Sequence, residues 1–126
     1  MKTCLIVDDS AVIRMVGRKI LEDLHFAVED CADFNMALSH CRERIPDAVL
    51  IEWRVKGESS ADFIEALRSL PGGINAVVLF CTNKTAQDDI EAALAIGAKE
   101  YIMKPFDSAV IELKFHRVGL LEGGGG

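Results

Sequence analysis

Short apolar runs alternate with longer amphipathic stretches along the whole chain, and this alternation predicts strands and helices in turn. The predicted strands are residues 4–7, 26–31, 48–51, 76–81 and 101–103. A first helix is capped by Ser10, and four more cover residues 34–43, 61–70, 85–96 and 107–115. The inner face of the first helix is predicted from the 3.6-residue period to be Val12, Ile13, Val16, Ile20, Leu21 and Leu24.

Five strands that alternate with five helices predict an α/β fold, a parallel sheet with helices on both faces. We expect the doubly wound, flavodoxin-like strand order 2-1-3-4-5. In such sheets, sites form at the carboxyl ends of the strands. The polar residues that follow the predicted strands should therefore share one edge; they are Asp8, Asp9, Glu52, Thr82 and Lys104.

Composition narrows the class of protein. The 126 residues predict one domain over 1–120 with a flexible glycine tail at 121–126, and a net charge of −6 disfavours nucleic-acid binding. No apolar run reaches the roughly 20 residues of a membrane span, and the early acids at Asp8-Asp9 disfavour a signal peptide. The four cysteines form no Cys-x-x-Cys pair, so we expect buried thiols in a reducing, cytoplasmic setting.

The residues at the predicted edge favour phosphoryl-transfer chemistry. Three carboxylates and one ammonium carry a net charge of about −2, and their mutual repulsion would be relieved by a divalent cation. Carboxylate oxygens suit Mg²⁺. The hydroxyl of Thr82 and the ammonium of Lys104 can bind phosphoryl oxygens. Together these groups are the parts for phosphoryl transfer to a carboxylate, with Glu52 at the acceptor position.

Four segments in order carry a specific resemblance: Val7-Asp8-Asp9-Ser10, Asp47 to Trp53, Cys81-Thr82, and Gly97 through Lys104-Pro105-Phe106. With these, the chain resembles a response-regulator receiver domain of the single-domain CheY-like type, over about residues 2–120. The resemblance implies a Mg²⁺ site formed by Asp8, Asp9, Glu52 and the backbone carbonyl of Arg54. It also implies phosphoryl binding by Thr82 and Lys104, a cis bond at Lys104-Pro105, and a switch made of Thr82 and Tyr101.

The resemblance also implies partners rather than substrates. We expect a stand-alone, monomeric signalling protein of a two-component phosphorelay, possibly in chemotaxis, which is not an enzyme and binds neither nucleic acid nor membrane. A sensor histidine kinase or phosphotransfer protein would act on it. A downstream target would bind the face formed by residues 85–96, 101–103 and the helix after Pro105.

Glu52 departs from the family, which has aspartate at the acceptor position. The extra methylene extends the carboxylate by about 1.5 Å, and a shift of that size can cost 10²-fold or more in transfer. Glu52 would then block phosphorylation or partly mimic it, since one charge replaces nearly two. The loop 54–60 has also diverged, which favours a natural variant over an introduced change. It brings cations at Arg54 and Lys56, and Lys84 adds another at the rim.

Other interpretations stay open at this point. Asp8-Asp9 could simply favour a helix N-terminus, Thr82 could be a strand-end cap, and Tyr101 could be a half-buried strand aromatic. Trp53 is expected to be a partly exposed packing residue. Trp53 and Arg54 could alternatively bind a nucleotide on a repurposed receiver scaffold. Phosphatase chemistry is a third hypothesis, disfavoured because the chain has no room for a cap over the substrate.

Overall fold

The structure is a computed structural model, and it describes residues 1–82, 91–92 and 94–122. The strands are β1 (Thr3–Val7), β2 (Ala27–Cys31), β3 (Ala48–Glu52), β4 (Arg54–Val55), β5 (Glu58–Ser59), β6 (Val77–Thr82) and β7 (Glu100–Met103). The helices are α1 (Ala11–Asp23), α2 (Phe34–Glu43), α3 (Ala61–Ser69), the short 3₁₀ helix η1 (Gly73–Asn75) and α5 (Ser108–Arg117).

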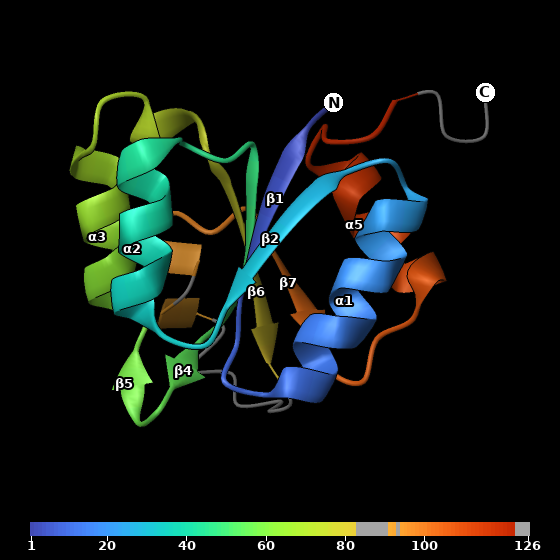
Figure 1. Cartoon of the computed structure of the whole chain (residues 1–126), viewed down its shortest axis with the longest axis horizontal. Coiled ribbons are helices and arrows are strands. Elements are labelled where there is room, and N and C mark those ends of the chain that lie inside the picture. Colours follow the sequence, from blue (N-terminus) through green and yellow to red (C-terminus); the bar gives the residue numbers. More distant parts are fainter. Residues whose placement is uncertain (83–90, 93, 123–126) are drawn as a thin grey trace.

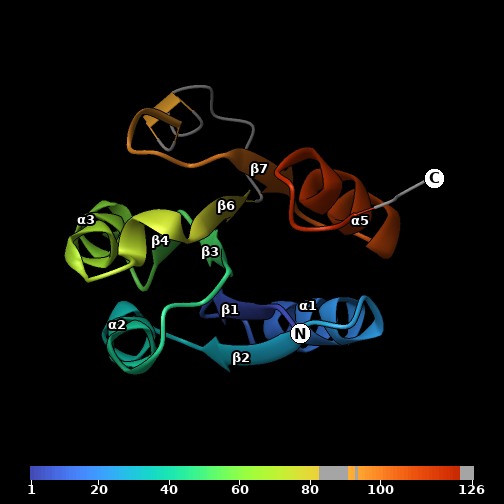
Figure 2. The same ribbon diagram turned by 90° about the horizontal axis from the view of Figure 1, so that it is seen from above.

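Five of the strands form one parallel sheet in the order β2-β1-β3-β6-β7. The predicted α/β fold and strand order are thereby confirmed. Helices α2 and α3 cover one face of the sheet, and α1 and α5 cover the other (Figures 1 and 2). The predicted fourth helix at 85–96 falls largely outside the described residues; of its length, 91–92 and 94–96 are described, with 91–92 and 94–95 helical and 96 in a turn.

Side chains alternate along each strand between two hydrophobic cores. The core under α2 and α3 takes Leu5, Val7, Val49, Ile51, Val78 and Phe80 from the strands. The core under α1 and α5 takes Cys4, Ile6, Ala48, Leu50, Leu79, Cys81 and Ile102. Because central strands are buried on both faces, they read as continuous apolar runs, and these were the strongest signals in the sequence.

The predicted inner face of α1 is partly wrong. Val12 is 62% exposed and Val16 is 37% exposed. The face that packs on the sheet consists of Ile13, Gly17, Ile20, Leu21 and Leu24. Gly17 belongs to this face because α1 lies close to β1 there: a Cβ atom at Gly17 would stand 3.1 Å from Cδ1 of Ile6. A periodicity based on apolar side chains passes over a glycine, and this displaced the predicted face.

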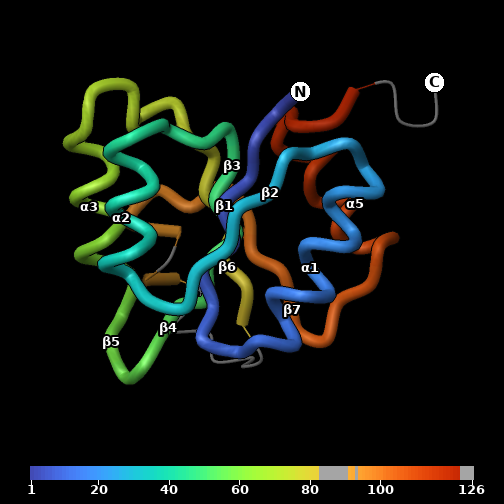
Figure 3. The backbone as a smooth tube through the Cα atoms, viewed as in Figure 1, coloured from blue at the N-terminus to red at the C-terminus, as the bar shows by residue number. Residues whose placement is uncertain are grey.

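The hairpin β4–β5 was not predicted from the sequence. Its two strands pair antiparallel, Arg54 with Ser59 and Val55 with Glu58. The turn between them has positive φ at both central residues, 52° at Lys56 and 81° at Gly57, as a tight two-residue hairpin turn requires. The hairpin extends beyond the carboxyl edge of the main sheet, next to the first turns of α2 and α3 (Figure 3).

The structure confirms the predicted Ser10 cap, the predicted cis bond at Lys104-Pro105 and the predicted burial of the cysteines. The side-chain oxygens of Ser10, Asp33 and Asp107 each accept a hydrogen bond from the backbone amide three residues further on, so they cap α1, α2 and α5. The Lys104-Pro105 peptide bond is cis. All four cysteines are free thiols and buried. Within the described part of the chain, no helix has both the length and the apolar character needed to cross a membrane.

Candidate functional site

Lys104 joins two of the predicted acids at the carboxyl edge of the sheet. Its Nζ atom lies 2.6 Å from Oδ2 of Asp8 and 3.3 Å from Oε1 of Glu52. The three side chains are only 10%, 2% and 13% exposed, respectively. The sequence therefore correctly placed these groups at one edge, and their charges interact in a partly desolvated setting where the attraction is stronger than in water.

Asp8 is fixed from several directions. It follows β1, and its amide donates to the carbonyl of Cys31 at the end of β2 (3.2 Å). Its Oδ1 accepts from the amide of Ser10 (2.9 Å). The Arg14 guanidinium donates to its carbonyl oxygen (2.7 Å) and pairs with Asp30 at 3.2 Å. Sequence reasoning missed Arg14, although its position on the second turn of α1, near Asp8, was a usable signal.

Glu52 ends β3 with its carboxylate held by two donors. Its Oε2 accepts the amide hydrogen of Trp53 at 2.7 Å, and Oε1 faces Lys104. Burial raises the pKa of Glu52 above its ordinary value, while the charge of Lys104 and the Trp53 amide act in the opposite direction. Glu52 therefore depends on Lys104 to carry its charge at this partly buried position.

Lys104 and Thr82 are held side by side. The amide of Lys104 donates to the carbonyl of Thr82 at 2.9 Å, and Thr82 is 6% exposed at the end of β6. Burial by itself lowers the pKa of Lys104, but the hydrogen bond and charge of Asp8, together with the charge of Glu52, outweigh it, and the net shift is upward. Lys104 is thus firmly cationic.

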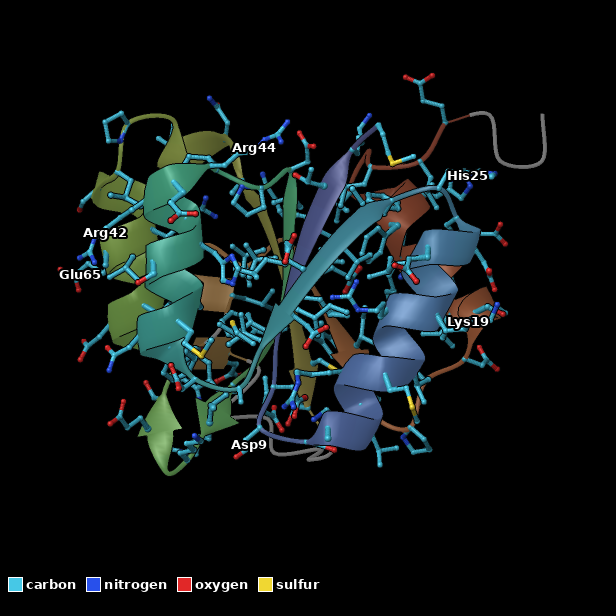
Figure 4. The ribbon with its side chains drawn as sticks, viewed as in Figure 1. Asp9, Lys19, His25, Arg42, Arg44 and Glu65 are labelled. Carbon is cyan, nitrogen blue, oxygen red and sulfur yellow. The ribbon has the colours of Figure 1, made fainter. Side chains whose placement is uncertain are left out.

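Asp9 lies apart from this buried group. It is exposed, at the edge between the start of α1 and the hairpin (Figure 4). Its Oδ2 accepts the amide hydrogen of Lys56 at the hairpin tip, at 3.0 Å. Arg54, whose carbonyl was expected to bind metal, is the exposed residue of strand β4, whose other residue, Val55, is buried. The hairpin thus donates a hydrogen bond to Asp9, an acid that the sequence analysis assigned to the Mg²⁺ site.

The donor types at this edge fit Mg²⁺, which prefers oxygen ligands. Asp8, Asp9 and Glu52 supply carboxylates, but each of them is engaged by protein donors. Among the residues that the structure describes, no three Asp, Glu, His or Cys side chains come together in a way that could hold a metal. The residues therefore fit the ion in kind, and an ion bound there would compete with the donors that these carboxylates now engage.

Comparison with known proteins decides the family. The sequence profile described as the response regulator receiver domain matches residues 4–116, most of the chain. The chain belongs to the response regulator receiver domain family. The receiver domain of a two-component system is a signalling module, and CheY-like structures are among its neighbours.

Curated relatives include the phosphate regulon transcriptional regulatory protein PhoB of Escherichia coli, 31% identical over 102 residues. The match covers 81% of this chain and 44% of that protein, so this receiver domain spans less than half the length of the curated relatives it matches. PhoB of Pseudomonas aeruginosa is 30% identical over 105 residues, which cover 83% of this chain and 46% of that protein.

Among solved structures, the chemotaxis response regulator CheY4 of Vibrio cholerae superposes with a TM-score of 0.86 at 26% identity, covering 94% of this chain and 98% of that one. The receiver domain of the sensor histidine kinase PA1611 from Pseudomonas aeruginosa has a TM-score of 0.82 at 25% identity, covering 92% of this chain and 95% of that one. Its structure is described with magnesium coordinated in the active-site cleft. Receiver domains bind Mg²⁺ in the active site.

Two aromatic residues of the receiver domain lie near the site. Trp53 was expected to be partly exposed, but it is only 8% exposed, because its ring packs edge-on against Phe80 with centroids 5.1 Å apart. Tyr101 is half-buried on β7. The ammonium of Lys114 lies 4.9 Å from the centre of the Tyr101 ring and 3.2 Å from Glu100. The predicted switch role of Tyr101 stays a prediction.

Proposed function

We propose that this receiver domain signals by protein contact without being switched by ordinary phosphotransfer. The observation that carries the proposal is Glu52 at the acceptor position, with its carboxylate already engaged by Lys104 and by the Trp53 amide. The group that would receive a phosphoryl group is longer than aspartate by one methylene. It is also bound to the lysine that would stabilise the transferred charge.

The position of Lys104 favours a blocked site over a mimic of the phosphorylated state. Lys104 is closer to Asp8 (2.6 Å) than to Glu52 (3.3 Å). A phosphoryl group would bring nearly two charges and three acceptor oxygens to this lysine, whereas Glu52 brings one charge at the longer distance. We therefore propose a receiver domain held in one signalling state, with Lys104 retained by Asp8.

Magnesium, where bound, would be held by Asp8, Asp9 and the backbone carbonyl of Arg54, and it would supply positive charge to the acidic edge. Both carboxylates can accept further bonds: Asp8 in addition to those from Lys104 and the Ser10 amide, and Asp9 in addition to that from the Lys56 amide. A nucleotide-binding role has no support, because the ring of Trp53 is buried against Phe80 and has no free face on which a base could stack.

Two exposed surfaces suit the proposed protein partners. Val12 and Met15 on α1, 62% and 65% exposed, form an apolar surface beside the carboxyl edge, where a histidine kinase or phosphotransfer protein would reach the site. Leu113 on α5 is 55% exposed, on the helix whose Lys114 covers Tyr101. This second surface is our proposed site for a downstream target.

Replacing Glu52 by aspartate tests the proposal. Native protein and Glu52→Asp are incubated with acetyl phosphate and Mg²⁺, and the added phosphoryl group is followed by intact-protein mass. We expect the variant to be phosphorylated and the native protein to react at least about 10²-fold more slowly, because the attacking oxygen is displaced by a methylene. Comparable labelling of native Glu52 would refute the blocked site. A variant that takes up no phosphoryl group would refute the acceptor assignment.

A further inference from the structure

A groove lies between α2 and α3, next to the hairpin. It has a volume of about 610 Å³, lined by Phe34, Asn35, Leu38, Glu58, Ser59, Asp62, Phe63 and Ala66. A smaller hollow of about 230 Å³ shares Phe34, Asn35 and Glu58 with it and continues to Val55 and Lys56. Glu58 and Ser59 of the hairpin thus line the groove, and the hairpin itself lies next to the first turns of α2 and α3 (Figure 3).

The floor of the groove is apolar. Phe34 from α2 stacks on Phe63 from α3, with ring centroids 5.9 Å apart and an interplanar angle of 15°. Phe34, Leu38 and Ala66 are only partly buried, so apolar surface remains accessible between the two helices. A volume of this size is within the range of sites that hold one or two large side chains or a small ligand.

The wall of the groove is acidic. Glu58 on β5 and Asp62 in the first turn of α3 are exposed, and neither has a salt bridge with a residue that the structure describes. Asp33, at the end near the hairpin, faces Lys56 at 4.0 Å, the limit of an ion pair. The lining of the two hollows therefore holds three acids against one lysine, in a chain whose net charge is −6.

We propose that this groove binds a basic amphipathic helix of a partner protein. An apolar side chain of such a helix would pack against the partly exposed Phe34 and Leu38, and its lysine or arginine side chains would pair with Glu58 and Asp62. Helix-in-groove recognition uses apolar anchors at helical spacing, and complementary charges at the rim give it specificity. The acidic wall selects a basic partner over an acidic one.

The groove is independent of the surfaces proposed above for the kinase and the downstream target. It is made by α2, α3 and the hairpin, whereas those surfaces lie on α1 and on β7–α5. The hairpin contributes to the groove through Glu58 and contacts the candidate site through the Lys56 amide, which donates to Asp9. None of the residues that line the groove belongs to the candidate site, so the proposed docking can be tested without changing residue 52.

The test uses a fluorescein-labelled peptide of leucine and lysine at helical spacing, and binding is measured by fluorescence anisotropy. The double variant Glu58→Lys/Asp62→Lys should weaken binding at least about tenfold, because it places like charges against the peptide. The matched control Glu112→Lys/Glu122→Lys makes the same change in net charge at exposed acids outside the groove, and its affinity should stay within about threefold of native.

A steric variant tests the apolar floor separately. Ala66→Trp fills the groove without changing charge, and it should also weaken binding about tenfold, with urea unfolding used to confirm that the variant folds. Equal losses in the groove and control charge variants would show non-specific attraction to an acidic protein and would overturn the proposal. So would an unchanged affinity in Ala66→Trp, or equally tight binding of a leucine–glutamate peptide.

Discussion

Replacing Lys104 by methionine should destabilise the fold substantially. The substitution keeps an apolar stem of similar length but removes the ammonium that lies 2.6 Å from Asp8 and 3.3 Å from Glu52. Two carboxylates then remain in a partly buried edge without their shared cation. Removing one partner of a buried ion pair typically costs about 3–5 kcal/mol, since the other charge is left uncompensated.

The loss of stability expected for Lys104→Met lies at the lower end of that range, because both carboxylates keep another hydrogen bond. Asp8 would keep the hydrogen bond from the Ser10 amide, and Glu52 would keep the one from the Trp53 amide. We therefore expect a loss of about 3 kcal/mol in the free energy of unfolding at pH 7. The matched control is Lys19→Met: Lys19 and Asp23 are 3.2 Å apart but 75% and 63% exposed, so we expect a loss below about 0.5 kcal/mol.

The loss should depend on pH in a defined direction. Burial raises the pKa of Glu52 above its ordinary value of 4.5, and the charge of Lys104 opposes that rise. Without Lys104, folded Glu52 binds its proton more tightly than unfolded Glu52 does. The penalty for ionised Glu52 is then fully present above the folded pKa, and it is relieved as pH falls toward 4.5. The gap between variant and native protein should narrow on acidification.

Equilibrium unfolding in urea with EDTA present measures these differences without any contribution from metal. A double-mutant cycle with Glu52→Gln isolates the contact between the two side chains, and we expect Lys104→Met to cost about 1 kcal/mol less in that background. A loss below about 1 kcal/mol for Lys104→Met, or a cycle with no coupling, would refute the view that Lys104 is the counter-ion of this site.

Two further predictions concern other parts of the fold. Arg68→Met should lower the free energy of unfolding in urea by about 2 kcal/mol, because the Arg68 guanidinium donates to the carbonyls of Gly73 (2.8 Å) and Ala76 (2.7 Å), which precede β6. The control Arg42→Met changes an exposed arginine and should alter that free energy by less than about 0.5 kcal/mol. Similar losses in the two variants would contradict the role of Arg68. Native protein should resist alkylation at pH 8, because burial raises the pKa values of the thiols to about 11 for Cys41 and about 12 for Cys4, Cys31 and Cys81. Rapid modification of any of them before unfolding would show that it is accessible, and all four should react in urea.

The sequence alone determined the architecture and the members of the site. Continuous apolar runs are typical of strands buried on both faces, so they predicted the central parallel strands. The strand order came from the resemblance to receiver domains, and the polar residues after the strands were expected to meet at the carboxyl edge. Lys104, Asp8 and Glu52 do meet there. The glutamate at position 52 is also a fact of the sequence, and our proposal that this domain is not switched by ordinary phosphotransfer rests on it.

Only the tertiary structure decided the pairings and the loops. The position of Gly17 in the α1 contact depends on how closely the helix approaches Ile6, and apolar periodicity does not record that distance. The hairpin turn requires positive φ at Lys56, and a lysine in the sequence does not indicate that conformation. The hairpin in turn places the Lys56 amide where it donates a hydrogen bond to Asp9. The groove between α2 and α3 likewise arises from side chains of three separate segments. Whether the Lys104 ammonium lies closer to Asp8 or to Glu52 depends on differences of a few tenths of an ångström between two distances, and only the folded chain defines those distances.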